Sequence, residues 1–135
     1  IDRYSKIKIM NNFNDNAYFV NDFINLDLIW NTGIGFGLFA SESTLIYNII
    51  STLISLVILI LIYTAIEADK FEKISFSVII GGALGNLYDR ISLKAVPDFI
   101  DLHYNDFHWF TFNLADIFIT LGILAFLTKG LFVKN

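Results

Sequence analysis

The sequence predicts a mainly α-helical protein that passes through a membrane several times. Hydrophobic residues make up 56% of the 135 residues and charged residues 16%, whereas soluble domains average roughly 45–50% and about 25%. Three long stretches with few or no charges, at 43–66, 74–90 and 110–133, are candidate membrane spans. The length suits a single domain covering residues 1–135.

The composition also excludes several classes of function. The chain has no cysteine, so disulfides, zinc–thiolate sites and thiol nucleophiles are excluded together. The net charge is -4 and no Lys/Arg stripe occurs, so a nucleic-acid partner is not expected. No His-Glu-x-x-His or Gly-x-Ser-x-Gly motif is present, which argues against a zinc protease and a serine hydrolase. His103 and His108 are interpreted as loop or interface residues rather than as a metal pair.

Residues 1–42 are expected to form strands and loops outside the membrane. The stretch 23–30 alternates imperfectly between apolar and polar residues, which favours a strand. The run Asn31-Thr32-Gly33-Ile34-Gly35-Phe36-Gly37 then breaks regular structure. This run does not fit a phosphate loop. It fits better a backbone edge to which an extended peptide can come close. Because the chain begins at Ile1 without a starting Met, we expect an upstream segment such as a first helix.

The candidate spans differ in how well they suit a membrane. The first, 43–66, has no charge over its 24 residues, and about 20 residues suffice for a helix to cross the hydrocarbon core. The second, 74–90, is shorter and ends in Asp89 and Arg90, so its charged end needs a wet interface or a buried partner. Residues 91–109, which follow it, are polar and are predicted to be a loop.

The distribution of basic residues predicts an orientation. The charged loop 67–73 and the tail with Lys129 and Lys134 lie on one side of the membrane, and residues 1–42 and 91–109 lie on the other. The positive-inside rule places the first pair in the cytoplasm. Three basic residues near the N-terminus count against this orientation.

Asp116 is the most informative residue, because it lies near the start of the third span, 110–133. An ionisable group at membrane depth costs roughly 2.5–3.5 kcal/mol even on the lenient insertion scale, which makes Asp116 a functional candidate. An acid near a helix N-terminus is also favoured simply as an anchor. Asn113 shares the helix face of Asp116; it either holds that carboxylate or a substrate backbone, or it caps the helix.

Asp98 alone is an ordinary loop carboxylate, and its interest lies in a pairing with Asp116. The predicted topology places both near the same extracytoplasmic surface. Two carboxylates held close together cannot both ionise cheaply, so one keeps a proton. In aspartic proteases the ionised carboxylate activates water and the protonated one hydrogen-bonds the scissile carbonyl. Asp101, three residues further on, is a rival for the same role.

The second span contains an unusual run of glycines and polar residues. Gly81 and Gly85 form a small-xxx-small pair, which predicts a close approach between membrane helices. Asn86 and Arg90 share a helix face, with Asp89 beside it, and polar groups there need partners in the protein or in a ligand. We expect Asp89 and Arg90 to contribute to a structural network.

Taken together, these motifs resemble the signature of the lipoprotein signal peptidase (signal peptidase II) family. The matching runs occur in the family's order: Asn31-Thr32-Gly33, Gly81-Gly82-Ala83-Leu84-Gly85-Asn86-Leu87-Tyr88-Asp89-Arg90, Asp98-Phe99-Ile100-Asp101 and Phe112-Asn113-Leu114-Ala115-Asp116. The run Asp2-Arg3-Tyr4-Ser5-Lys6 also resembles the end of that family's first membrane helix.

The resemblance implies a four-transmembrane-helix bundle, truncated here to residues 1–6 of its first helix, with an extracytoplasmic β-cradle at 7–42 and a short extracytoplasmic helix. It implies a monomeric aspartic endopeptidase of the bacterial inner membrane, facing the periplasm, that needs no metal or cofactor. Its substrate would be a diacylglyceryl-modified prolipoprotein, cut before the lipidated cysteine, and globomycin-type peptides would inhibit it. The resemblance makes Asp98 and Asp116 the catalytic dyad. It gives a supporting role to Asn31, Gly33, Asn86, Arg90, Asn113, Asp2 and Lys6.

The chain departs from the family pattern at a few positions, and two other functions are possible for a chain with these residues. Ile34-Gly35 replaces the usual pair of alanines, Arg3 replaces a glutamine, and Pro97 stands where a valine is common and removes one N–H donor. A transporter with Asp116 as its ion site is one alternative, but no internal repeat supports it. A membrane scaffold is the other, and it leaves the polar residues unexplained.

Overall fold

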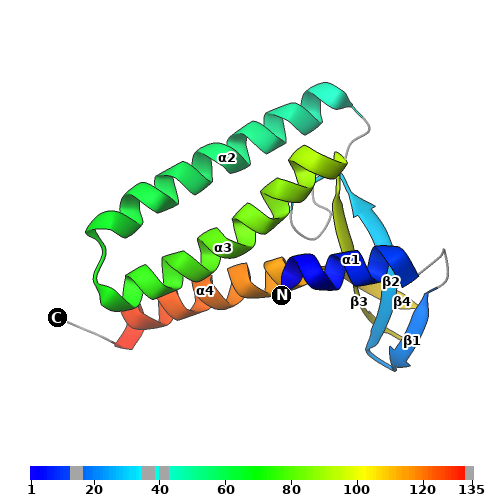
Figure 1. Ribbon diagram of the computed structural model, residues 1–135. Helices are drawn as coiled ribbons and strands as arrows, with labels where there is room; N and C mark the ends of the chain where they lie inside the picture. Colours follow the sequence, from blue (N-terminus) through cyan, green and yellow to red (C-terminus); the bar gives the residue numbers. More distant parts are fainter. Residues whose placement is uncertain (13–16, 35–38, 40–42, 133–135) are drawn as a thin grey trace.

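The computed structural model describes residues 1–12, 17–34, 39 and 43–132. Three long helices lie next to one another, and a four-stranded antiparallel sheet lies at one end of them (Figure 1). The helices are α1 (Asp2–Asn12), α2 (Thr44–Glu67), α3 (Lys70–Leu93) and α4 (Leu114–Phe132). The strands are β1 (Tyr18–Asn21), β2 (Ile24–Asn31), β3 (Val96–Tyr104) and β4 (Phe107–Phe112), in the order β1-β2-β3-β4.

Helix α2 agrees with the first predicted span, and β2 agrees with the predicted strand at 23–30. Within the described part of the chain, α2 is the one helix long and apolar enough to cross a membrane by length and composition, and 11% of its apolar window is buried. The expected count of four spans is therefore not confirmed. Among the same residues every helix is one of α1 to α4, so the short extracytoplasmic helix has no counterpart there.

Helix α3 lies between α2 and α4, and glycines allow a close contact between α3 and α4 (Figure 1). A Cβ atom on Gly82 would lie 2.6 Å from the backbone oxygen of Ala115, and a Cβ on Gly122 of α4 would lie 2.6 Å from a side-chain atom of α3. Gly81 faces open space, with nothing within 4 Å. The prediction that Gly81 forms the contact was therefore wrong, whereas Gly85 does face α1 and α4.

The far ends of α3 and α4 are joined by charged residues. Helix α3 begins with a capping box, in which the Asp69 carboxylate accepts hydrogen bonds from the backbone N–H groups of Phe71 and Glu72. Lys129 of α4 forms ion pairs with Asp69 and with Glu72, the latter at 3.0 Å. The loop 67–73 and Lys129 therefore lie at the same end of the helices, as the predicted topology requires.

The segment 91–109 is not the predicted polar loop. Most of it forms β3 and part of β4, which pair as an antiparallel hairpin, and β3 also pairs with β2. Helix α4 starts at Leu114 rather than at 110, because 107–112 belong to β4. The sheet thus takes two strands from the predicted cradle at 7–42 and two from a later segment. Helix α1 continues to Asn12, beyond the expected end at residue 6.

The most deeply buried side chains include an unusual proportion of polar groups. Most of them cluster where α1, α3, the start of α4 and the β2–β3 pair meet, whereas Ser75 lies near the other end of α3, and Asp101 and His103 lie on the opposite face of β3 from Asp98. Those with an exposed fraction of 7% or less are Lys6, Asn31, Ser75, Asp89, Arg90, Asp98, Asp101, His103, Asn113 and Asp116. Because buried polar groups are costly unless they are hydrogen-bonded, this cluster is where a function should be sought.

Candidate active site

Asp116 and Asn113 form a reciprocal cap at the start of α4. The Asn113 side-chain oxygen accepts a hydrogen bond from the backbone N–H of Asp116 at 3.1 Å, and Asp116 Oδ2 accepts one from the backbone N–H of Asn113 at 3.2 Å. This is the geometry of a capping box, with aspartate in place of glutamate. The capping and functional interpretations of these two residues are therefore compatible, since the cap occupies only one carboxylate oxygen of Asp116.

Asp98 lies on β3 and receives two side-chain amides. Asn113 Nδ2 donates to Asp98 Oδ1 at 2.6 Å, and Asn31 Nδ2 donates to Asp98 Oδ2 at 2.8 Å. Only 1% of Asp98 is exposed. Burial away from water raises the pKa of Asp98 to about 6, and the nearby Asp116 carboxylate adds to the shift. Asn113 thus contacts both acidic residues. Its amide nitrogen donates to the Asp98 carboxylate, and its amide oxygen accepts from the Asp116 backbone N–H.

A tight turn after β2 fixes the orientation of Asn31. The Asn31 side-chain oxygen accepts a hydrogen bond from the Gly33 backbone N–H at 2.7 Å, and its amide nitrogen also donates to the Ile34 backbone oxygen at 2.9 Å. These contacts settle which end of the amide faces Asp98. The remaining glycines of the predicted turn, 35 and 37, lie outside the described residues.

The other oxygen of Asp116 is connected to a buried cation through Asn86. Asn86 Nδ2 donates to Asp116 Oδ1 at 2.9 Å, and Asn86 Oδ1 accepts from Lys6 Nζ at 2.8 Å. Lys6 is fully buried and is neutralised by Asp2 and Asp89, each at 2.8 Å. The Asn86 side chain on α3 therefore bridges Lys6 of α1 and Asp116 of α4.

The remaining residues of this network bind the N-terminal helix to the site. Asp2 Oδ1 accepts a hydrogen bond from the Ala115 backbone N–H at 2.9 Å, so α1 helps to cap α4. Arg3 pairs with the fully buried Asp89 at 2.5 Å. Sequence reasoning treated Asp89 as structural, and its contacts agree. The Arg3–Asp89 pairing was missed, because its partners are 86 positions apart along the chain.

Arg90 differs from its neighbour Asp89. It is 3% exposed, and its Nε and Nη1 atoms have no hydrogen-bond partner within the described part of the chain. It is close enough to interact electrostatically with Asp98 and Asp116. Because a buried guanidinium is rarely left with free donors, these atoms are available to a bound molecule. The structure therefore separates Asp89, which joins helices, from Arg90, which lies within electrostatic range of Tyr47 and of the two carboxylates.

Asp101 is held apart from this group. It lies three residues after Asp98 on β3, and residues an odd number apart face opposite sides of a strand. Asp101 Oδ2 lies 2.7 Å from His108 Nδ1 and 3.5 Å from Asn25 Nδ2, and the His103 ring stacks on His108 with centroids 5.3 Å apart. The two histidines lie on strands rather than in a loop.

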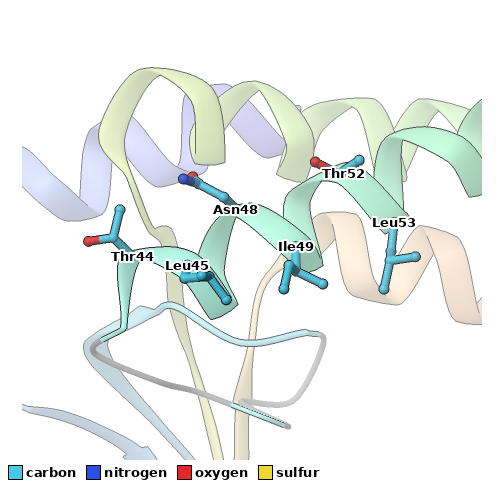
Figure 2. Close-up of a pocket in the computed structure, with 6 residues that line it drawn as sticks. All are labelled: Thr44, Leu45, Asn48, Ile49, Thr52 and Leu53. Atoms are coloured by element: carbon cyan, nitrogen blue, oxygen red, sulfur yellow. The ribbon is translucent and has the colours of Figure 1, made fainter.

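The described residues form no metal cluster, and a hollow on the surface of α2 does not include the carboxylates. Over residues 1–12, 17–34, 39 and 43–132, no group of three or more His, Asp or Glu side chains is arranged to hold a metal ion. A hollow of about 590 Å³ runs along one helix, α2, and contains no candidate residue (Figure 2). Its described lining is Thr44, Leu45, Asn48, Ile49, Thr52 and Leu53.

Solved structures of bacterial membrane enzymes share this fold. One, determined by the in meso method, matches with a TM-score of 0.78 and 28% identity, and the match covers 96% of this chain and 80% of that one. A second matches with a TM-score of 0.76 and 27% identity, covering 98% and 86% of the two chains. The fold is that of a bacterial membrane enzyme, with its polar residues gathered at one end of the helices.

Sequence comparison identifies the family within that class. The family model of signal peptidase (SPase) II matches residues 1–132. The lipoprotein signal peptidase of Pelagibacter ubique (strain HTCC1062) is 50% identical over 117 residues, which are 87% of this chain and 70% of the relative. That of Anaplasma phagocytophilum (strain HZ) is 46% identical over 115 residues, 83% and 72% of the two chains. The chain belongs to the signal peptidase II family, whose members are proteases that process lipoproteins.

Proposed function

We propose that Asp98 and Asp116 are the acid–base dyad of an aspartic endopeptidase that cleaves a prolipoprotein before its diacylglyceryl-modified cysteine. The observation that carries this proposal is the position of Asn113, which hydrogen-bonds Asp98 at 2.6 Å and caps the backbone of Asp116 at 3.1 Å. One short side chain therefore holds both residues at a common point. Such preorganisation is what a two-carboxylate mechanism requires.

The chemistry follows from the shared environment of the pair. Since both carboxyls are buried and the Asp116 carboxylate disfavours ionisation of Asp98, the pair keeps one proton at pH values up to about 6. The ionised carboxylate removes a proton from a water molecule as that water attacks the scissile carbonyl, and the protonated carboxyl hydrogen-bonds the carbonyl oxygen. The C–N bond then breaks, and the proton taken from water passes to the leaving amine. The free Arg90 donors are available to substrate carbonyl groups near the dyad.

The test compares three buried or nearly buried acids by conservative replacement. We expect Asp98→Asn and Asp116→Asn each to abolish cleavage of a lipid-modified prolipoprotein in a gel-shift assay, whereas Asp101→Asn retains it. Asp101 is a matched control, because it is 4% exposed and is hydrogen-bonded on the same strand as Asp98. Membrane extraction with carbonate checks that each variant still inserts. Normal cleavage by Asp98→Asn, or an inactive Asp101→Asn, would overturn the dyad assignment.

We further propose a placement in the membrane that suits this substrate. Helices α2, α3 and α4 span the bacterial inner membrane, α1 ends a fourth span, and the sheet lies on the periplasmic side. Three lysines, Lys70, Lys73 and Lys129, lie at the end of α3 and α4 opposite the dyad, and this end is assigned to the cytoplasm. The protein acts as a monomer without a metal or cofactor, and globomycin-type peptides compete with the substrate at the dyad.

A further inference from the structure

Tyr47, near the start of α2, is a buried residue that the proposed reaction does not use. It is 9% exposed, and the other buried residues of this helix are Ile50 and Ile58. Helix α2 lies next to α3 (Figure 1), so its buried side chains are those that pack against the rest of the protein. A buried tyrosine hydroxyl usually has a specific hydrogen-bond partner. The partners of this hydroxyl therefore indicate its role.

The Tyr47 hydroxyl contacts both ends of one residue of α3, Arg90. It donates a hydrogen bond to the Arg90 backbone oxygen at 2.7 Å. The guanidinium of Arg90 also has a side-chain hydrogen bond with Tyr47. The same backbone oxygen accepts from the Lys94 backbone N–H at 3.1 Å, so the end of α3 does not depend on Tyr47 alone. A residue that only joined α2 to α3 would need the backbone contact and not the contact with the guanidinium.

The Arg90 guanidinium lies near two carboxylates, yet part of it stays unpaired. Its Nε and Nη1 atoms have no hydrogen-bond partner within the described part of the chain, although Asp98 of β3 and Asp116 of α4 are close enough to interact electrostatically. A guanidinium fork binds a carboxylate through two parallel hydrogen bonds when nothing prevents it. An unrestrained Arg90 would therefore close on the carboxylates, and its free donors would be lost to the substrate.

We propose that Tyr47 is a positioning residue that holds the Arg90 guanidinium away from the dyad and presents its free donors to the substrate; this inference rests on the proposed function. A neutral hydroxyl suits this task, because it holds the guanidinium without neutralising its charge. Tyr47 acts through Arg90 rather than on the substrate. The start of α2 thereby becomes part of the site, although it supplies no group to the reaction itself.

The charged surroundings of Arg90 predict what happens when this restraint is removed. The ionisable groups that act on Arg90 or on the dyad come from α1, α2, β3 and α4, and they are Asp2, Lys6, Tyr47, Asp98 and Asp116. Lys6 is fully buried and already paired with two carboxylates, so Arg90 is the cation whose position a change at Tyr47 alters. A closer cation favours the charged form of a carboxyl. The pKa of Asp98, about 6 in the wild type, would fall, and the dyad would lose its proton at a lower pH.

The test compares Tyr47→Phe with the wild type, using the full chain in lipid nanodiscs and a lipid-modified prolipoprotein as substrate. We expect Tyr47→Phe to lower kcat/KM roughly tenfold, which is the effect of one lost hydrogen bond to a charged group. The alkaline limb of its pH profile should move down by about one pH unit. Tyr63→Phe is the matched control, because it makes the same change on the same helix at a residue that is 74% exposed. Both quantities should keep their wild-type values in Tyr63→Phe.

A second substitution separates an effect through Arg90 from an effect on the fold. Arg90→Lys keeps the charge but removes the planar fork. If Tyr47 acts through Arg90, the double variant Tyr47→Phe/Arg90→Lys is no slower than Arg90→Lys alone. If Tyr47 only joins α2 to α3, Tyr47→Phe lowers the melting temperature, leaves the pH limb in place, and multiplies the loss caused by Arg90→Lys. Where Arg90→Lys gives no measurable cleavage, the pH limb of Tyr47→Phe decides alone.

The outcomes separate this inference from the proposed function. A pH limb that Tyr47→Phe leaves unmoved, or that Tyr47→Phe and Tyr63→Phe move equally, overturns the inference and leaves the dyad untouched. Full activity of Arg90→Lys does the same, because the donors would then have no role. Cleavage that survives Asp98→Asn overturns the proposed function itself. A limb that moves in Tyr47→Phe alone supports Tyr47 as the residue that positions Arg90.

Discussion

Replacing Asp98 with asparagine removes a buried ionisable carboxyl group without changing the size of the side chain. In the unfolded chain this carboxyl has its ordinary pKa of 3.8, whereas in the fold burial and the nearby Asp116 raise the pKa of Asp98 to about 6. The folded protein therefore binds this proton more tightly than the unfolded chain does. The resulting stability is fully present below about pH 3.8 and is lost as the pH rises through about 6.

The size of the effect follows from the shift in pKa. The whole difference corresponds to about 3 kcal/mol, of which about 2 kcal/mol is lost between about pH 4.5 and about pH 7.5. Asparagine places an N–H group where the wild type has an oxygen that accepts from Asn31 or Asn113. That substitution adds a constant penalty of about 1–3 kcal/mol. The informative quantity is therefore the change with pH, not the stability of the variant at one pH.

Thermal unfolding of purified protein in detergent, across this pH range, measures that change. The melting temperature of Asp98→Asn relative to the wild type should rise by roughly 5–10 °C between about pH 4.5 and about pH 7.5. Asp106→Asn is the control, because Asp106 is exposed in the turn between β3 and β4, and its difference from the wild type should stay flat. If the melting-temperature difference between Asp98→Asn and the wild type is also independent of pH, the conclusion that burial raises the pKa of Asp98 is refuted.

Two further variants test the packing and the buried charges. Gly82→Ala should lower the free energy of unfolding by about 1–3 kcal/mol, because the added Cβ would lie 2.6 Å from the Ala115 backbone oxygen. Gly81→Ala is its control: a Cβ there meets nothing within 4 Å, so this variant should be neutral or stabilising in the same melting assay. Equal effects of the two alanines would contradict the close contact of α3 with α4. Lys6→Met leaves the fully buried Asp89 without one of its two cations and should cost about 3–5 kcal/mol. An unchanged melting temperature for Lys6→Met would show that the network carries little stability.

Local patterns in the sequence were enough to predict α2, β2 and the interest of Asp116. An uncharged stretch of helix length and an alternating stretch are properties of neighbouring residues, and so they can be read directly. An acid within an apolar segment is just as local. The same reasoning failed for 91–109, because polar residues there suggested a loop. In the structure they form β3 and part of β4, and the pairing of β3 with β2 depends on residues far away in the chain.

The choice between Asp98 and Asp101 shows why the site itself resisted prediction. Both are acids of one short run, and composition does not distinguish them. Their difference arises from strand alternation, which directs Asp98 to Asn31 and Asn113 and directs Asp101 to His108. Since the sequence predicted no strand here, that alternation was not available to the argument. The family resemblance selected Asp98, and that selection stays a prediction, which the contact of Asn113 with both Asp98 and Asp116 supports.

The contacts also indicate how the two carboxyls divide the work. Asp116 lies in the first turn of α4, where the helix dipole favours negative charge, and Asn86 connects it to the Lys6 ammonium. The two side-chain hydrogen bonds that Asp98 accepts come from neutral amides. We therefore infer that the single proton of the dyad resides mainly on Asp98. On the proposed mechanism, Asp98 would then hydrogen-bond the scissile carbonyl and Asp116 would activate the water. The buried lysine on α1 would act as a positioning residue that never touches the substrate, because it stabilises the anion on which the attack on the carbonyl depends.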